Sequence, residues 1–254
     1  MKKPINKNQK FVEKFFIKKG LKTLVDLSKK KKRSVNKMIV SEPYLPELDD
    51  LYNLYQYILI NKRTTILEFG SGWSTLIFSL ALNELSNKFS NEVKQLRRNN
   101  PFELFVVENE KKYLNITKNR ILKFNKYLKI KKPIKIKYFL SDVEMTTFEN
   151  RICTQYKKLP LCNPDFIYLD GPDQFNIKGN KYGINLNHKD LMPMSGDLLS
   201  IEHFLKPGTI LIVDGRAANS RFLKLNFQRK WKYSYNKIND QHIFFLNEEP
   251  LGKL

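Results

Sequence analysis

The sequence predicts an α/β fold of three layers, in which a mostly parallel, seven-stranded sheet lies between helices and ends in an antiparallel hairpin. From residue 64 onward, short apolar runs alternate with helical stretches, as expected for parallel strands that are buried on both faces. Near the C-terminus two further apolar runs are separated only by a short polar turn, which predicts the hairpin. Hydrophobic residues make up 41% of the 254 residues, enough for one large core.

Each expected element follows from local periodicity and from the turn residues that bound it. The expected parallel strands are 65–69, 104–108, 134–140, 166–170 and 209–214, and the hairpin pairs 231–237 with 242–247. The expected helices are 48–60, 74–85, 110–127 and 197–205.

Positive charge is concentrated at the N-terminus. The net charge is +21, and residues 1–40 alone hold 14 basic and 2 acidic residues. This division predicts a basic helical arm with its linker at 1–46 and a main domain at 47–254. Aromatic and aliphatic residues recur among the lysines at helical spacing. That pattern favours three alternatives: a helix packed on the main domain, contact with an anionic membrane surface, or contact with nucleic acid.

Several classes of protein are disfavoured. No uncharged apolar run reaches about 18 residues, so a membrane-spanning helix is not expected. The lysine-rich N-terminus lacks the apolar stretch of a signal peptide. Cys153 and Cys162 are too few for a disulfide framework and lack zinc-ligand spacing. The prediction is a cytoplasmic protein, with peripheral contact of the arm with the inner membrane face as one of the alternatives.

A glycine turn between a strand and a helix carries the first candidate site. Gly70 and Gly72 follow the strand 65–69, and Ser74 or Thr75 caps the next helix. Glycines allow close approach of a ligand, and the helix N-terminus offers free N–H groups to an anion. Glu68, two residues before the first glycine, suits a positively charged amino group. Together these features predict a site for an amino-acid head group rather than a diphosphate.

Two more carboxylates end the next two strands. Glu108 follows an apolar strand, where an acidic residue can accept both hydroxyls of a ribose. Asp142 follows the third strand and is placed to accept a hydrogen bond from an adenine amino group. Because ligands of open α/β sheets bind at the carboxyl edge, Glu68, Glu108 and Asp142 are expected to share one site.

The run Glu-Phe-Gly-Ser-Gly-Trp-Ser-Thr that begins at Glu68 resembles motif I of class I S-adenosylmethionine-dependent methyltransferases. The resemblance spans roughly residues 64–247 and includes the late hairpin. It implies a Rossmann-like sheet and S-adenosylmethionine as cofactor. It also implies that Gly70, Gly72 and Ser74 face the methionine part, Glu108 the ribose and Asp142 the adenine. The sequence departs from the motif at its third glycine, which is Ser74, and 87–101 is expected to be an insertion.

Two aspartates mark the predicted reaction end of the site. Asp170 and Asp214 end the fourth and fifth strands, and the pair suggests a general base or a site for a hard divalent cation. Catechol-type O-methyltransferases, which this region resembles, place magnesium on such residues, but Gly215 stands where they have asparagine. The metal is therefore left unassigned. The run Asp-Gly-Pro at 170–172 resembles some polysaccharide-modifying methyltransferases.

A long polar stretch between Pro172 and Met194 is expected to form a lid over the acceptor. It supplies Lys178, Tyr182 and His188, of which His188 is the candidate proton acceptor beside Asp170 and Asp214. Arg216 is expected to pair with an anionic acceptor.

The functional prediction is a methyltransferase that acts on a small-molecule or glycan-type acceptor. One alternative is an RNA methyltransferase, favoured by the net charge. A nicotinamide oxidoreductase is disfavoured by Glu68 and by the missing third glycine. A non-catalytic scaffold that binds polyanions through residues 1–40 is the remaining alternative.

Overall fold

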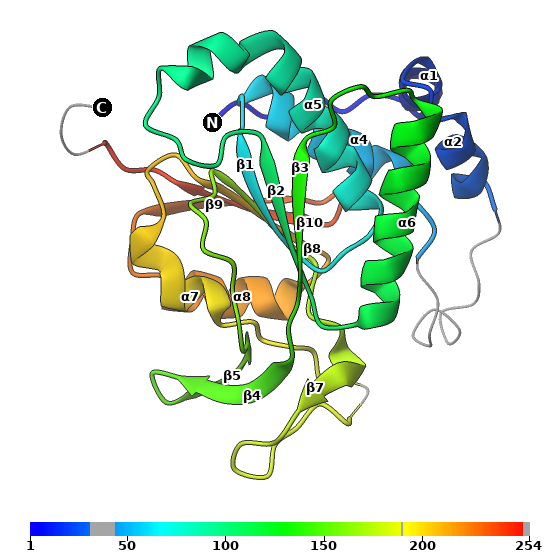
Figure 1. The fold of residues 1–254 in the computed structure, drawn as a ribbon. Coiled ribbons are helices and arrows are strands. Elements are labelled where there is room, and N and C mark those ends of the chain that lie inside the picture. The colour runs from blue at the N-terminus through cyan, green and yellow to red at the C-terminus, as the bar shows by residue number, and fades with distance from the viewer. Residues whose placement is uncertain (31–43, 189, 251–254) are drawn as a thin grey trace.

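The computed structural model describes residues 1–30, 44–188 and 190–250. Its main feature is a seven-stranded sheet between two layers of helices (Figure 1). All seven strands predicted from the sequence are present. In order across the sheet they are β3 (Lys135–Leu140), β2 (Glu103–Glu108), β1 (Thr65–Phe69), β6 (Phe166–Leu169), β8 (Ile210–Asp214), β10 (Gln241–Leu246) and β9 (Trp231–Asn236).

The first five strands of this order run parallel, and β10 is reversed. In the centre of the sheet Leu67 of β1 is level with Phe105 of β2 and Ile167 of β6. Strand β10 pairs antiparallel with β8 on one side and with β9 on the other. The predicted hairpin is therefore confirmed, with its second strand inserted between β8 and β9.

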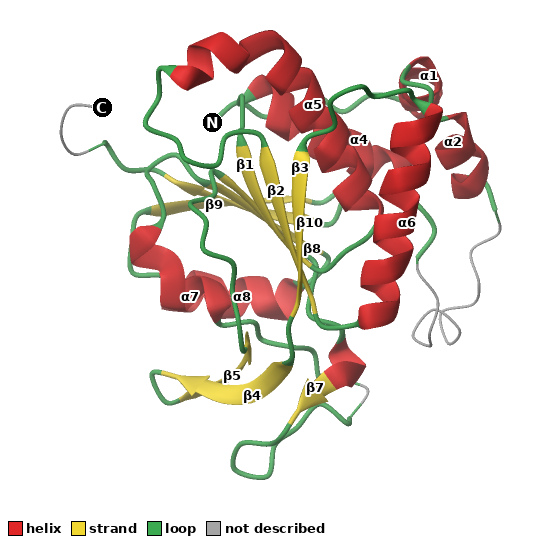
Figure 2. Ribbon diagram, viewed as in Figure 1, coloured by secondary structure: helices red, strands yellow, loops and turns green. Residues whose placement is uncertain are grey.

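Helices cover both faces of the sheet (Figure 2). Alternate residues of each strand point to opposite faces, so Ile66 packs in one cluster and Leu67 in the other. The first cluster includes α4 (Leu48–Ile60), α5 (Trp73–Lys94) and α6 (Lys111–Tyr127), and the second includes α7 (Asp197–Ile201) and α8 (Ala217–Asn226). This arrangement confirms the predicted three-layer Rossmann-like class. The sequence analysis did not predict α8, and the start of the stretch predicted as an insertion continues α5 to Lys94.

The N-terminal arm packs against the helix layer formed by α4. It contains α1 (Gln9–Lys18) and α2 (Lys22–Ser28), whose apolar residues Phe16 and Leu24 are fully buried. The ring of Phe15 makes edge contacts with Tyr52 and Tyr55 of α4, at centroid distances of 5.0 and 5.2 Å. Packing on the main domain, one of the three alternatives, is thus present. Contact with a membrane stays a prediction, and most of the basic run 29–33 lies outside the described residues.

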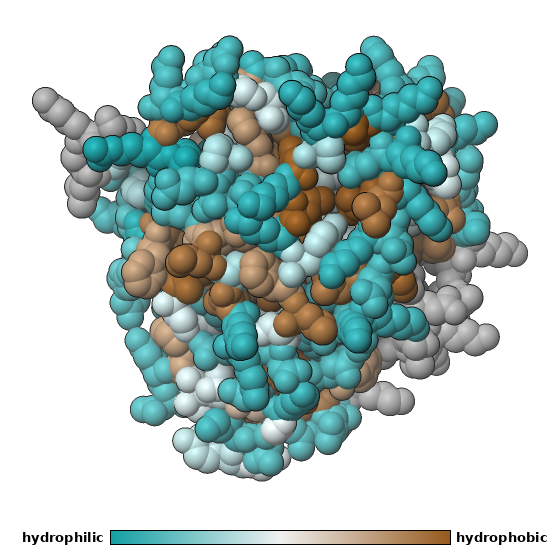
Figure 3. All heavy atoms as spheres, in the orientation of Figure 1, coloured by the Kyte–Doolittle hydropathy of each residue, from teal (hydrophilic) through white to brown (hydrophobic). Residues whose placement is uncertain are grey.

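A second, smaller sheet lies beyond the carboxyl ends of the parallel strands (Figure 1). Its order is β5 (Arg151–Tyr156), β4 (Val143–Phe148) and β7 (Ile177–Lys178). The sequence analysis missed this sheet. Strand β7, preceded by a short 3-10 turn at Gln174–Asn176, comes from the stretch predicted as a lid. In Figure 3 apolar side chains form a band across the middle of this face, above the small sheet. Among the described residues, no helix is long and apolar enough to cross a membrane.

Candidate functional site

The backbone after β1 bends sharply at Gly70, and the fold requires glycine there. Gly70 has φ +93°, in the region that favours glycine. A Cβ atom at Gly70 would lie 3.1 Å from the backbone of both Asp170 and Gly171, which follow the neighbouring strand β6. The end of β6 therefore fixes the course of the turn that starts α5.

The second glycine of the turn has no comparable steric requirement. Gly72 has φ −170°, which is extended backbone that any residue adopts. A Cβ atom there would meet only the hydroxyl of Ser74, at 3.8 Å. The N–H of Gly72 donates to Oγ1 of Thr75 at 3.1 Å, which fixes the first turn of α5. The space beside Gly72 is thus open to a ligand that approaches the start of α5.

Glu68 lies behind this turn and is 1% exposed. Ser74 donates its hydroxyl to Oε1 of Glu68 at 2.5 Å, whereas Oε2 is buried with no partner among the described residues. Burial raises the pKa of Glu68 to about 8, against the opposing effect of the Ser74 and Thr75 hydrogen bonds. The structure thus brings Glu68 and Ser74 together. Their predicted contact with a ligand stays a prediction.

Glu68 is expected to make the stability of the protein fall as pH rises. The pKa of Glu68 is ordinarily 4.5 and is about 8 in the folded protein. The contribution of Glu68 to the free energy of unfolding is therefore complete below pH 4.5 and is lost as pH rises through 8. Urea unfolding of Glu68→Gln should show a flatter pH profile than wild type, and higher stability at about pH 8.5.

The control for this pH profile is Glu92→Gln, which removes an exposed carboxylate from the last turn of α5, at the end of the helix far from Glu68. Its difference from wild type should stay constant over the same pH range. A Glu68→Gln profile parallel to that of wild type would show that Glu68 ionises normally in the folded protein.

Glu108 ends β2 and points its carboxylate toward the glycine turn. It is 3% exposed, and Ser71 of the turn donates its hydroxyl to Oε2 at 2.8 Å. The backbone N–H groups of Asn109 and Glu110 donate to Oε1 at 2.9 and 3.0 Å. Burial raises the pKa of Glu108, and these donors oppose the rise. Because Oε2 has a single donor among the described residues, it retains acceptor capacity for a ligand hydroxyl.

Asp142 lies next to Glu108, at the junction of β3 and β4. The N–H of Ser141 donates to the backbone oxygen of Glu108 at 3.0 Å, which holds the two strand ends together. The side chain of Asp142 is half exposed and pairs with Lys178 at 2.9 Å. The hydrogen bond from Lys178 lowers the pKa of Asp142. A residue of the predicted lid thus contacts a predicted cofactor residue, and adenine would have to share Asp142 with Lys178.

Asp170 and Asp214 follow neighbouring strands, because Leu169 of β6 is level with Val213 of β8. Burial and the charge of Asp170 raise the pKa of Asp214, while hydrogen bonds from Tyr168 and Gln241 lower it. Burial by the surrounding protein atoms also raises the pKa of Asp170, although about 51% of its side-chain surface is exposed to solvent. The structure therefore brings these two predicted catalytic aspartates together, with raised proton affinity.

Arg216 holds the end of β6 in place. Its Nη2 donates to the backbone oxygens of Asp170 and Pro172, at 2.7 and 3.2 Å, and its Nε lies 3.8 Å from Oδ1 of Asp170. Its Nη1 is buried without a partner among the described residues. The predicted pairing of Arg216 with an anionic acceptor therefore has Nη1 available and stays a prediction.

Two acidic residues that the sequence analysis missed also face this region. Burial raises the pKa of Asp50, and the charges of Asp214 and Glu47 raise it further. Asn239 donates to Oδ1 of Asp50 at 2.8 Å. Glu47 and Asp50 stand at the start of α4, where acidic residues are common because they suit the helix dipole. Sequence alone therefore offered an ordinary explanation for them.

His188 lies in an exposed part of the predicted lid. Asp190 donates its N–H to Nδ1 of His188 at 3.3 Å, and its carboxylate lies 3.8 Å away. Within the described part of the chain, the polar partners of His188 thus belong to its own loop, and the structure does not bring it into contact with Asp170 or Asp214. Nor do the described residues include a group of three or more potential metal ligands placed to hold an ion.

No protein-family model matches the chain, and no curated protein matches its sequence. Solved structures resemble it at low identity. The SAH-bound methyltransferase PaMTH1 from Podospora anserina is 13% identical, with a TM-score of 0.49 over 98% of this chain and 100% of that one. The O-methyltransferase from Bacillus cereus in complex with SAH is 12% identical, with a TM-score of 0.43 over 94% and 97%. TomG, an O-methyltransferase from Streptomyces achromogenes in complex with SAM, is 9% identical, with a TM-score of 0.43 over 96% and 100%.

At these identities the likeness concerns the fold. The strand order of the large sheet, with β10 as its one reversed strand, agrees with the Rossmann-like sheet and late hairpin predicted from the sequence. The glycine turn, the acid after β2 and the two aspartates all lie at the carboxyl edge of this sheet, where open α/β sheets bind their ligands.

Proposed function

We propose that the protein is an S-adenosylmethionine-dependent methyltransferase. The observation that carries the proposal is the contrast within the glycine turn. The fold requires Gly70, whereas the space beside Gly72 is left open although nothing in the structure forbids a side chain there. A ligand that lies against Gly72 and the start of α5 accounts for this difference.

The residues of the site fit this cofactor at three points. Open space beside Gly72 would receive the methionine part, whose carboxylate suits the free N–H groups at the start of α5. The unpartnered Oε2 of Glu68 would accept a hydrogen bond from the amino group. Oε2 of Glu108 would accept from the ribose hydroxyls, and Asp142 beside it would accept from the adenine amino group.

S-adenosylmethionine supplies an activated methyl group when it is bound, and positioning and proton removal fall to the protein. Asp170 and Asp214 are the candidate general bases, since their raised proton affinity suits proton uptake near neutral pH. One of them would take up and hold the proton that the acceptor oxygen or nitrogen loses on methylation. Holding the acceptor in line can contribute about 7–11 kcal/mol to the rate acceleration.

The acceptor that we propose is a small molecule or a glycan-type group. The small sheet β5-β4-β7 lies beyond the carboxyl ends of the main strands and borders the site through Asp142 and Lys178. Its residues, with Tyr182 and His188 of the same extension, are the candidates for contacts that select the acceptor.

Calorimetry with SAH tests the cofactor assignment. Wild type is expected to bind one equivalent, and Gly72→Ala to unfold at the same urea concentration as wild type but to bind SAH at least about tenfold more weakly. The loss is expected because the added methyl group would occupy the ligand's place while making only an ordinary contact with the protein, 3.8 Å from Oγ of Ser74.

The control is Asn91→Ala, a substitution at an exposed position near the C-terminal end of α5. Its SAH affinity should equal that of wild type. If wild type bound no SAH, or if Gly72→Ala bound it normally, the cofactor assignment would be wrong.

A further inference from the structure

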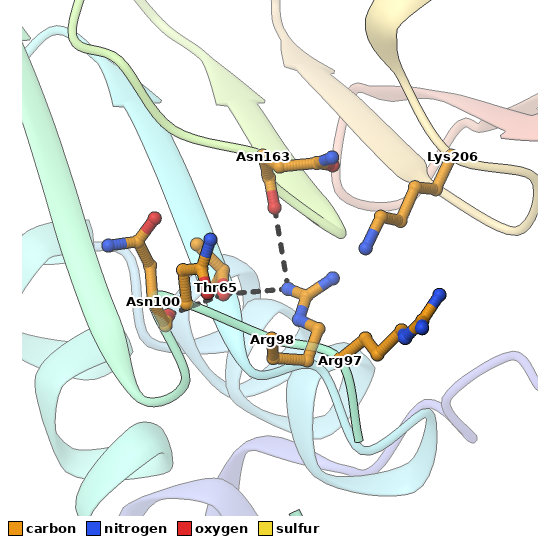
Figure 4. A pocket seen from close by; sticks show the side chains of 7 residues that line it. Thr65, Arg97, Arg98, Asn100, Asn163 and Lys206 are labelled. Carbon is orange, nitrogen blue, oxygen red and sulfur yellow. Dashed lines mark hydrogen bonds between the residues drawn. The ribbon is translucent and has the colours of Figure 1, made fainter. Parts of the chain in front are cut away.

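A hollow lies at the edge of the main sheet where the parallel strands begin, opposite the edge that carries the candidate site (Figure 4). Its volume is about 100 Å³, and its lining includes the start of β1, three asparagines and three basic side chains. The basic side chains are those of Arg97, Arg98 and Lys206. In Figure 4 the ammonium end of Lys206 points toward the guanidinium of Arg98. The hollow thus gathers cations well away from the candidate methyltransferase site.

Arg98 is a fixed part of this hollow. Its side chain is only 11% exposed. Its Nη2 donates to Oγ1 of Thr65 at 2.7 Å and to the backbone oxygen of Asn163 at 3.4 Å, and it lies 3.2 Å from Oδ2 of Asp165. All three contacts use Nη2, so within the described chain the other guanidinium N–H groups remain available for a ligand.

The carboxylates at this edge are already engaged. Asp165 accepts from the backbone N–H groups of Thr64 and Thr65 and from the hydroxyl of Thr64, at 2.9 to 3.0 Å, besides its contact with Arg98. Glu103, at the start of β2, pairs with Lys137 at 2.7 Å. In the part of the chain that the structure describes, neither Arg97 nor Lys206 has an acidic partner within salt-bridge distance.

Positive charge at this edge is therefore in excess. Arg63 donates Nη1 to the oxygen of Gly208 at 3.0 Å. Burial and the charge of Arg98 lower the pKa of Arg63, and the charge of Asp165 opposes them. Burial and the charge of Arg98 lower the pKa of Lys206, with Asp165 only partly opposing them. Like charges held this close are unfavourable, and a bound anion would relieve their repulsion.

We propose that this hollow binds a single tetrahedral oxyanion, namely free phosphate or the phosphate group of a small molecule. The free N–H groups of Arg98 would form the fixed side of the site, and Arg97 and Lys206 would close over the anion. A hollow of about 100 Å³ has room for several water molecules, and so for one such group. This inference does not depend on the proposed methyltransferase activity.

Isothermal titration with inorganic phosphate and with glycerol 3-phosphate, at constant ionic strength set with sodium chloride, tests the proposal. Wild type is expected to bind one equivalent of phosphate. Removing the two exposed cations in Arg97→Gln/Lys206→Gln should weaken binding by about tenfold or more. This double variant leaves the Arg98–Asp165–Thr65 contacts intact, and a urea unfolding midpoint equal to that of wild type will confirm the fold. Tighter binding of glycerol 3-phosphate than of phosphate would identify a phosphomonoester as the ligand.

The matched control is Lys123→Gln/Lys126→Gln, which removes the same number of charges from the exposed side of α6. It should bind phosphate as wild type does. Equal weakening in both double variants would show a general effect of net charge and would overturn the site. Absence of phosphate binding in wild type would also overturn it.

Discussion

Replacing Glu108 by glutamine is expected to weaken SAH binding by about a hundredfold. The carboxylate would accept two ribose hydroxyl groups, and hydrogen bonds to a charged group contribute about 1.5–3 kcal/mol each. The isosteric amide keeps an oxygen for the N–H groups of Asn109 and Glu110 but presents a donor toward Ser71 and the ribose. Calorimetry with SAH on wild type and Glu108→Gln measures the loss.

The control for this experiment is Glu144→Gln, which removes an exposed carboxylate that pairs with Lys157 on the small sheet. Its SAH affinity should stay at the wild-type value. Normal SAH binding by Glu108→Gln would refute the ribose role of Glu108, while leaving the methionine end of the site to be judged from Gly72→Ala.

Replacing Gly171 by alanine is expected to lower the free energy of unfolding by about 3 kcal/mol or more. A Cβ atom at Gly171 would lie 2.6 Å from the backbone nitrogen of Gly70 and 2.9 Å from the carbonyl carbon of Phe69. It would also lie 2.8 Å from the hydroxyl of the buried Tyr156. Because these neighbours are mostly backbone at the ends of two central strands, relief requires the strands to separate. Urea unfolding measures the effect.

Gly72→Ala is the matched control, since it adds the same methyl group in the same region without a close contact. The two variants should separate the contribution of the turn to stability from its contribution to SAH binding. Gly171→Ala should lose stability, and Gly72→Ala should keep it while losing SAH affinity. Equal stability of both variants would contradict the close packing of the ends of β1 and β6.

The central sheet could be predicted because its strands are short, apolar and separated by amphipathic helices. The small sheet could not. In β4 only Val143 and Met145 have buried side chains, and the turn to β5 is formed by Glu149 and Asn150, both with positive φ, rather than by glycine. Helix α8 was hidden for a related reason, since its buried side includes Asn219 and Ser220. Strand β4 buries few residues, and the buried side of α8 includes polar ones, so the apolar periodicity of both elements is weak.

The candidate site was predictable in its residues but not in their orientations. Strand ends place Glu108, Asp170 and Asp214 at one edge, and the structure has them there. Glu68 shares its face of β1 with Ile66, which packs in the helix cluster that includes α5. Its position behind the turn could therefore have been read from the alternation of the strand. The approach of Asp50 to Asp214 depends on how α4 packs, which no local pattern specifies.

The reversed strand β10 has a consequence for how the chain reaches its final state. Residues 241–246 occupy an interior position between β8 and β9, so the backbone groups along one side of β8 find their partners only after this late segment has been synthesised. Until then β8 is an open edge that other chains can pair with. Pairing along this side of β8 is thus expected to be a late step of folding, and loss of β10 would convert an interior pairing into an aggregation-prone border.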